Sequence, residues 1–387
     1  MESGTAIRTA RMLVAGMAAL AMPIPGVAQA PIDRLDLHGS LTQGYAVSRD
    51  AQLFGVPTDG TLDYGSAALQ LRYLLTHDDH LVVQFEHRRL GNSVLSRDAA
   101  AVQLDWMFYQ RFLGSFDARL GRVPMPQGIF NEVRDIGILL PFYRAPGNFY
   151  MEGFEAIDGV VLSYRRPIGA WHIESTVFGG AFDFHAVETS PDGVRLSKQR
   201  RRNALGNQFW LETPVRGVRV GLGAVRWDIR NQEGELAAET SWRAAAEAVL
   251  GRSTARAEYR AMDHVGHTMV SYYGQAGFNL TDHWTVNAQA EFENRKMKLA
   301  MDGEAGTSMP MDPQSGSGMS GTGHSSRELE FPYARDVAFG INYRFAYNLV
   351  FKLEAHRASG YNFDDFFDRT GSAGTTDYFI VSVATAF

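Results

Sequence analysis

The chain has 387 residues, a formal net charge of −6, 12% aromatic residues and no cysteine. This mild charge argues against a nucleic-acid partner, and the lack of cysteine excludes a disulfide scaffold. After the first thirty residues, no stretch reaches the roughly twenty apolar residues of a transmembrane helix, which excludes a helical membrane protein.

Residues 1–30 have the features of a secretory signal peptide. A region with two arginines precedes an apolar run from Met12 to Met22, which is too short to span a bilayer. Small residues then offer cleavage after Ala28 or after Ala30, and both sites remain open. The alternative is a buried N-terminal helix. A signal peptide predicts export of the mature chain, 31–387.

Apolar and polar residues alternate with period two over about ten positions in segment after segment of the mature chain. Near the end of the chain, for example, Leu349, Phe351 and Leu353 alternate with Val350, Lys352 and Glu354. A tilted membrane-crossing strand has this length and one apolar face. The predicted strands cover about 35–47, 64–75, 80–90, 101–113, 115–123, 157–166, 170–183, 205–213, 217–230, 239–250, 253–264, 269–280, 283–299, 335–345, 347–358 and 375–387.

Two expectations concern details of these strands. In 217–230, Trp227 has the opposite parity from Val220 and Leu222, which predicts a β-bulge near Ala224. Aromatic residues near strand ends are expected in girdles at the membrane interfaces. These are Tyr45, Trp106, Tyr109, Trp171, Trp210, Trp227, Trp242, Trp284 and Tyr343.

The links between the predicted strands alternate between tight and generally longer ones. Gly114-Ser115 and Gly251-Arg252 are tight, whereas 124–156 and 300–333 are long. Such sorting is typical of an up-and-down barrel with short periplasmic turns and long external loops, and a β-sandwich gives no reason for it. We therefore predict an all-β fold, a transmembrane antiparallel up-and-down β-barrel of about 16 strands.

The last segment, 375–387, alternates large and small residues and ends on Phe387. An exposed apolar edge would pair with other chains, whereas closure against the first strand removes that edge. A barrel of this size leaves an aqueous channel. Charges of both signs on one face would cost much free energy to bury in an apolar core, whereas in water they remain solvated. The predicted pore wall comprises Arg72, Arg88, Asp105, Asp117, Arg119, Arg243, Arg256, Glu258, Arg260, Glu291 and Arg344.

The link 124–156 is predicted to constrict the channel. Its apolar residues between Ile136 and Phe142 favour packing on the inner wall, and the alternative is folding over the mouth or a neighbouring subunit. Charges at the narrowest point set ionic preference through their local field. The candidates for this position are Glu132, Arg134, Asp135, Arg144 and Glu152.

The stretch 120–135 resembles the passage from strand to inner loop in Gram-negative porins. Gly121-Arg122 ends the strand, a Pro-x-Gly turn follows, and Asn131-Glu132-Val133-Arg134-Asp135 enters the loop. The terminal Phe387 resembles the signal that the outer-membrane assembly machinery reads. The resemblance implies a sixteen-stranded, trimeric diffusion channel of the cell outer membrane with an inward-folded third loop. It does not assign anion or cation preference.

The main functional prediction is therefore a porin, a passive channel for small hydrophilic or ionic solutes. The alternative is an outer-membrane barrel enzyme of the lipase or protease type. We predict no enzymatic activity, because no spacing of Ser, His and Asp sets up a nucleophile with its base. We also predict no cofactor and no metal. His77-Asp78-Asp79-His80 occupies a tight turn, and 301–326 is predicted as an external loop although its methionines suit a soft metal ion.

The predicted partners are outer-membrane lipid and lipopolysaccharide, the assembly machinery, small hydrophilic solutes and further copies of the chain in a homotrimer. No nucleic acid is expected. The basic cluster from Lys198 to Arg202 is placed in an external link, where the alternatives are binding of lipopolysaccharide phosphates, attraction of anions to the channel mouth, and simple solvation.

Overall fold

The computed structural model describes residues 34–93, 101–150, 154–190, 193–230, 236–264, 267–299, 327–360 and 374–387. The predicted signal peptide and the Met-rich stretch 301–326 lie outside these ranges. Residues Asp36–Phe387 form one compact unit. In the described part of the chain, no helix is long and apolar enough to cross a membrane.

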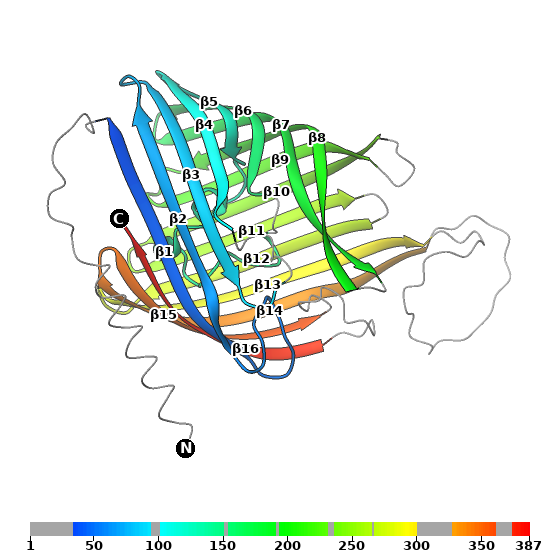
Figure 1. The fold of residues 1–387 in the computed structure, drawn as a ribbon. Helices are drawn as coiled ribbons and strands as arrows, with labels where there is room; N and C mark the ends of the chain where they lie inside the picture. Colours follow the sequence, from blue (N-terminus) through cyan, green and yellow to red (C-terminus); the bar gives the residue numbers. More distant parts are fainter. Residues whose placement is uncertain are drawn as a thin grey trace, which may run out of the picture. The chain divides into compact units, whose positions relative to one another are not determined.

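The described residues contain sixteen strands, which form one closed sheet in which neighbours pair antiparallel (Figure 1). This confirms the predicted fold class. The strands are β1 (Leu35–Ser48), β2 (Thr61–Leu74), β3 (Asp79–Leu90), β4 (Gln103–Leu113), β5 (Phe116–Pro124), β6 (Ala156–Ile168), β7 (Trp171–Ser190), β8 (Gly193–Glu212), β9 (Val218–Arg230), β10 (Leu236–Leu250), β11 (Ser253–His264), β12 (His267–Asn279), β13 (Trp284–Leu299), β14 (Arg327–Ala346), β15 (Leu349–Gly360) and β16 (Gly374–Ala386).

The first and last strands close the ring, as the apolar C-terminal segment predicted. β1 pairs with β16 from Ser40 opposite Ala386 to Ser48 opposite Tyr378. The backbones of Gly39 and Phe387 exchange two hydrogen bonds of 3.0 Å. A Cβ at position 39 would overlap the Phe387 ring, so glycine lets that ring lie close to the β1 backbone. Closure leaves no unpaired edge in the sheet.

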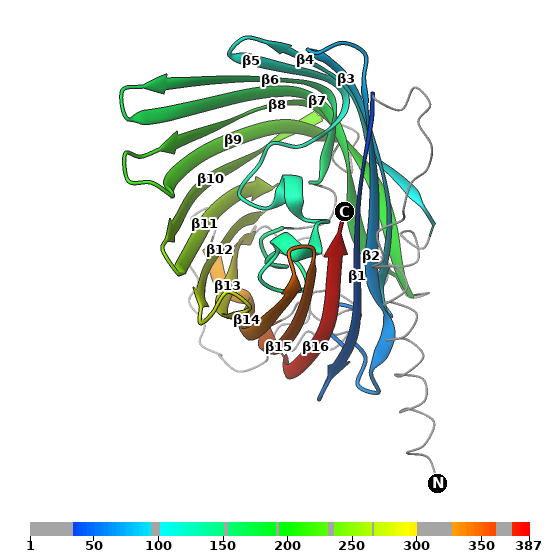
Figure 2. The ribbon, with the colours of Figure 1, turned by 90° about the vertical axis from the view of Figure 1, so that its left-hand side faces the viewer.

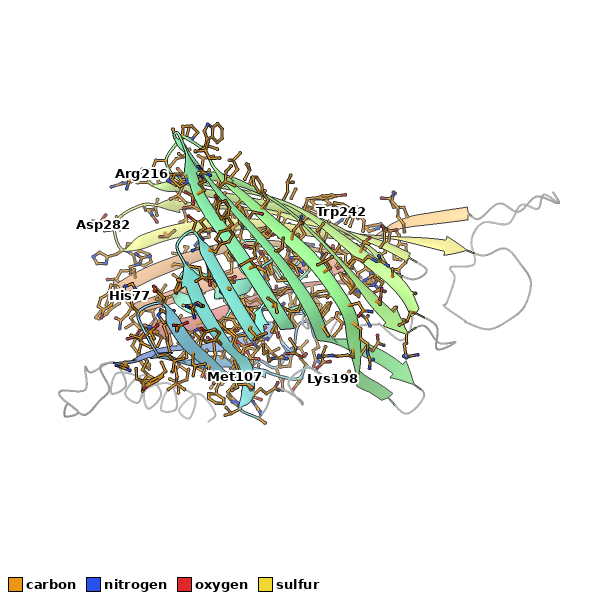
Figure 3. The ribbon with its side chains drawn as sticks, turned by 90° about the horizontal axis from the view of Figure 1, so that it is seen from above. His77, Met107, Lys198, Arg216, Trp242 and Asp282 are labelled. Carbon is orange, nitrogen blue, oxygen red and sulfur yellow. The ribbon has the colours of Figure 1, made fainter. Side chains whose placement is uncertain are left out.

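Short turns gather at one end of the barrel, where Figure 3 shows His77, Arg216 and Asp282. Gly114 and Gly251 open two-residue turns with φ of +61° and +58°, the left-handed conformation that tight hairpins need. The opposite end differs from prediction at 184–204. There β7 continues to Ser190 and β8 begins at Gly193, so Lys198–Arg202 lies on a strand and not in a loop.

The two faces of the sheet differ in chemistry. On β15, Phe351 and Leu353 are exposed on the outer face, whereas Lys352 and Glu354 are buried on the inner face. The inner face is not polar throughout, however. Between β3 and β12 it carries a packed apolar cluster formed by Val82, Trp106, Phe108, Val123, Met125, Phe154, Ala156, Ile157, Val161, Phe178, Phe182, Ala204, Val225, Trp227, Met262 and Met269.

Two of the predicted girdle residues belong to that cluster, and a bulge explains the first. Gln84 of β3 pairs with Trp106 and Phe85 pairs with Leu104, so Asp105 is an extra residue on β4. Side-chain parity reverses there. Trp106 is buried inside, and Met107 is exposed outside (Figure 3).

The second exception, Trp227, lies on a regular strand. β9 pairs with β10 without interruption from Val218 to Arg230, so the bulge predicted near Ala224 is absent. The indole is fully buried and donates a hydrogen bond of 2.6 Å to Glu239. The irregularity lies on the neighbouring strand instead, between Arg202 and Leu205 of β8.

Candidate channel constriction

The described residues between β5 and β6, 125–150 and 154–155, lie inside the ring of strands (Figure 2). We call residues 125–155 the inner loop. It contains two short 3₁₀ helices, η1 (Asn131–Val133) and η2 (Gly137–Leu139). The Asn131 amide joins the two ends of the loop by donating to the carbonyls of Met125 at 2.8 Å, Phe154 at 3.2 Å and Glu155 at 3.1 Å.

Lys352 of β15 is the most strongly engaged anchor of the inner loop. Its buried ammonium donates three hydrogen bonds of 2.7 Å, to the carbonyls of Gly137, Leu140 and Phe142. A lysine ammonium has three donors and no acceptor, so this arrangement uses its full capacity. The ammonium thus provides a donor to the carbonyls of Leu140 and Phe142, and a second donor to the Gly137 carbonyl, which also accepts from the Leu140 N–H at 3.3 Å.

Glu258 of β11 holds the opposite part of the loop. Its carboxylate accepts hydrogen bonds from the hydroxyls of Tyr150 and Tyr273 and, at 3.1 Å, from the backbone N–H of Ile129. Phe130, Phe149 and both tyrosines form one aromatic cluster around it. Burial, together with the negative charge of Glu258, raises the pKa of Tyr150 well above its usual value, so its hydroxyl remains a donor.

Further strands contact the loop with single hydrogen bonds. Ser40 donates to the Asp135 carbonyl at 2.7 Å, and Asn342 donates to the Pro141 carbonyl at 2.9 Å. The Asn148 N–H donates to Glu291 at 2.8 Å. The inner loop is therefore fixed to β1, β11, β13, β14 and β15, and it crosses the interior rather than extending outward.

The predicted constriction charges do not form a single ring. Glu132 is half-exposed and lies 3.5 Å from Arg119 of β5. Arg134 pairs with Glu155 at 3.2 Å. The Arg144 guanidinium stacks on Phe54, 3.6 Å from the ring centre. Glu152 lies outside the described residues.

Asp135 belongs to a compact carboxylate cluster around Arg88 of β3. The Arg88 guanidinium contacts Glu86 and Asp135 at 2.9 Å each and Glu155 at 3.1 Å. Oxygens of Glu86, Asp105 and Asp135 lie within 4.8 Å of one another. Because like charges this close repel strongly, the guanidinium is the group that allows the carboxylates to share one site.

No protein-family model and no curated protein matches the chain. Several solved structures, by contrast, are similar to the structure of this chain. The OmpF complex with daunomycin from Salmonella typhi has a TM-score of 0.57 at 13% identity, over 91% of this chain and 97% of that chain. The anion-selective porin of Comamonas acidovorans has a TM-score of 0.55 at 11% identity, over 91% of this chain and 99% of that chain. The outer membrane channel DcaP of Acinetobacter baumannii has a TM-score of 0.54 at 9% identity, over 91% of this chain and 97% of that chain.

The chain has the fold of an outer-membrane porin. At sequence identities of 9–13% the similarity establishes the fold alone. The properties of the site are therefore inferred from the residues of this chain. Ten of the eleven predicted wall residues, from Arg72 to Glu291, lie on the inner side of this porin barrel, half-buried or buried. Arg344 lies on the same side near the turns and is exposed.

Several wall arginines stack on aromatic rings of the inner loop. Arg243 and Arg260 are opposite one another on β10 and β11, and their guanidiniums lie 5.5 and 5.1 Å from the Phe149 ring centre. Arg256 lies 5.4 Å from the Phe130 ring centre. Such cation–π contacts hold positive charge against the loop and add to its seating.

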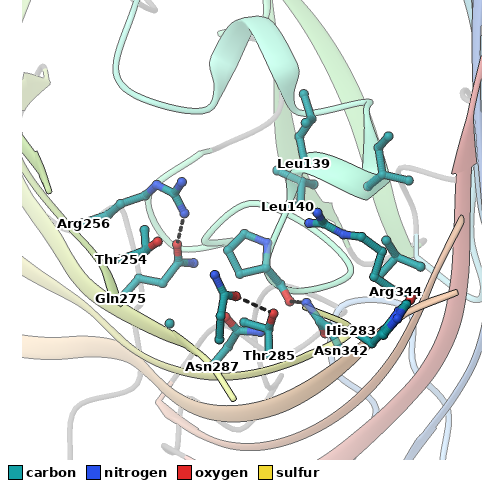
Figure 4. Close-up of a pocket in the computed structure, with 15 residues that line it drawn as sticks. Leu139, Leu140, Thr254, Arg256, Gln275, His283, Thr285, Asn287, Asn342 and Arg344 are labelled. Carbon is teal, nitrogen blue, oxygen red and sulfur yellow. Dashed lines mark hydrogen bonds between the residues drawn. The ribbon is translucent and has the colours of Figure 1, made fainter. Parts of the chain in front are cut away.

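Between η2 of the inner loop and β11–β15, the barrel interior contains a partly open cavity of about 200 Å³ (Figure 4). We call it the turn-side cavity. Leu139 and Leu140 lie on the loop side, and the wall side is polar. The polar wall residues are Thr254, Arg256, Gln275, Asn279, His283, Thr285, Asn287, Asn342 and Arg344.

Sequence reasoning missed the residues that fix the loop. Lys352 was assigned to the inner face by parity alone, and Asn342 and Ser40 were not singled out. A lysine between Phe351 and Leu353 in a long alternating strand carries no local signal of its partners. The three carbonyls that it binds are more than 200 positions away in the sequence.

Proposed function

We propose that the protein is a passive diffusion channel of the outer membrane for small hydrophilic or ionic solutes. The observation that carries the proposal is the inner loop, which narrows the barrel interior and is held there by Lys352 and Glu258. A loop tied to the wall by side chains of several strands forms a fixed constriction. In this proposal Glu132, Arg134, Asp135, Arg144 and Glu152 set the ionic preference.

Planar-bilayer recording tests this function. The folded full-length barrel is expected to give stepwise increases of conductance in potassium chloride, and the reversal potential in a salt gradient reports ion preference. A barrel that inserts without steps would contradict the proposal. Hydrolysis of ester or peptide substrates by such a non-conducting barrel would support the alternative, an outer-membrane enzyme.

We also propose a homotrimer with bound lipopolysaccharide. A trimer form of OmpT, an outer membrane protein of Vibrio cholerae, has a TM-score of 0.50 at 12% identity. On the outer face of β5–β8, charged side chains form a connected chain: Arg122–Asp158 at 3.3 Å, Arg200–Asp158 at 2.7 Å, Arg200–Asp183 at 3.1 Å and Lys198–Asp183 at 2.9 Å. Three cations with two carboxylates leave one excess positive charge, which suits a lipid phosphate.

Native mass spectrometry of protein extracted from outer membranes checks both proposals. We expect the mass of three chains with retained lipopolysaccharide, and less lipid on Lys198→Ala because its ammonium is largely exposed. Lys296→Ala is the control, since its ion pair with Glu330 lies on a different part of the barrel. A lipid-free monomer under mild extraction would contradict both.

A further inference from the structure

The turn-side cavity has an electrostatic imbalance that the channel function does not require. Arg256 and Arg219 share one carboxylate, that of Glu247, at 2.6 and 2.7 Å. This triad therefore carries one net positive charge. Arg344 adds a second, because in the described part of the chain no carboxylate pairs with its guanidinium and none lines the cavity.

The cavity also contains an unused hydrogen-bond donor. The Asn287 side chain is buried, and its Nδ2 has no acceptor among the described residues. A buried donor without a partner costs free energy unless a ligand or water satisfies it. Glycine at position 277 keeps the space in front of Asn287 open, since a Cβ there would lie 2.9 Å from Oδ1.

The backbone around Arg344 is fixed and places the guanidinium at the cavity. The Arg344 N–H donates to the His283 carbonyl at 2.8 Å, and His283 Nδ1 lies 2.7 Å from the Arg344 carbonyl. A bulge between Arg344 and Ala346 follows directly. Arg344, Arg256 and Asn287 thus approach one space from β14, β11 and β13 (Figure 4).

We infer that the turn-side cavity is a binding site for small organic anions bearing carboxylates. Arg344 and Arg256 provide the positive field, and the Asn287 amide donates the orienting hydrogen bond. The inference rests on the proposed channel function, in which such an anion would pause at the inner loop during passage. A partly open cavity of about 200 Å³ has room for a compact dicarboxylate.

Succinate and putrescine test the site, because they have similar length and opposite charge. With the channel open in potassium chloride, millimolar succinate is expected to interrupt the current and putrescine is not. Arg344→Gln is expected to weaken the succinate effect roughly tenfold, the loss of one charge-assisted contact. Asn287→Asp, which places a carboxylate in the cavity, is expected to abolish it.

Arg216→Gln is the matched control, since Arg216 has the same charge and lies in a turn at the same end, outside the cavity (Figure 3). The inference is overturned if putrescine acts like succinate, or if Arg344→Gln behaves like Arg216→Gln. Normal conductance steps without a succinate effect would refute the anion site and leave the proposed channel function in place. If no steps occur, calorimetric titration of the detergent-solubilised barrel with succinate still decides whether the site binds.

Discussion

Lys352→Met is expected to lower the free energy of unfolding by about 3 kcal/mol and to increase single-channel conductance. The variant keeps most of the length of the side chain but removes the ammonium donor from the carbonyls of Leu140 and Phe142, and leaves the Gly137 carbonyl with only the Leu140 N–H. Each buried carbonyl without a partner costs free energy, and relief from burying the ammonium offsets only part of that cost. The least costly response is for η2 to leave the wall, which widens the passage.

Urea unfolding followed by tryptophan fluorescence gives the stability, and bilayer recording gives the conductance. Lys296→Met serves as the control, because the Lys296 ammonium is half-exposed in its pair with Glu330 and contributes little. Unchanged conductance and stability in Lys352→Met would show that the ammonium does not hold the loop.

Arg88→Met has the second large expected effect. At neutral pH it is expected to lower the free energy of unfolding by roughly 3 kcal/mol. Without the guanidinium, Glu86, Asp135 and Glu155 lose their shared cation and repel one another and Asp105. A proton on any of these carboxylates removes one negative charge and weakens their mutual repulsion. Stability of the variant should therefore rise as the pH falls from neutral towards about 5.

Calcium ions provide a second way to rescue the same variant. Oxygens of Glu86, Asp105 and Asp135 are close enough to bind one ion at the roughly 2.4 Å that calcium prefers. Thermal unfolding with and without calcium at two pH values measures both effects. Arg89→Met is the control, since Arg89 forms an exposed pair with Asp63. Equal unfolding curves for the two variants would refute the assignment.

The sequence contained most of the information needed for the barrel. Alternation is a property of each strand by itself, so β15 and β16 were placed to within a few residues, and the apolar end at Phe387 predicted closure. Strand ends on the loop side were harder to place. β7 and β8 pair with each other beyond the predicted strand ends at 183 and 205, and the polar residues there had predicted a loop because they show no apolar alternation.

The arrangement of side chains inside the barrel was harder to predict, because it depends on single inserted residues and on partners far away in the sequence. One extra residue, Asp105, reverses the parity of β4 and moves Trp106 inside, and no local pattern marks such an insertion. The inner loop was predicted from its apolar content, but its anchors were not. Glu258, Asn342 and Lys352 become recognisable only when the strands that carry them stand opposite the loop.

The distance in sequence between the inner loop and its anchors also has a consequence for biogenesis. Residues 125–155 are synthesised well before β15, yet Lys352 of β15 is the residue that holds η2. Until the final hairpin joins the ring, the narrow passage has only some of its supports. A barrel caught before the final hairpin pairs would thus have a more weakly held inner loop and a wider interior than the finished one.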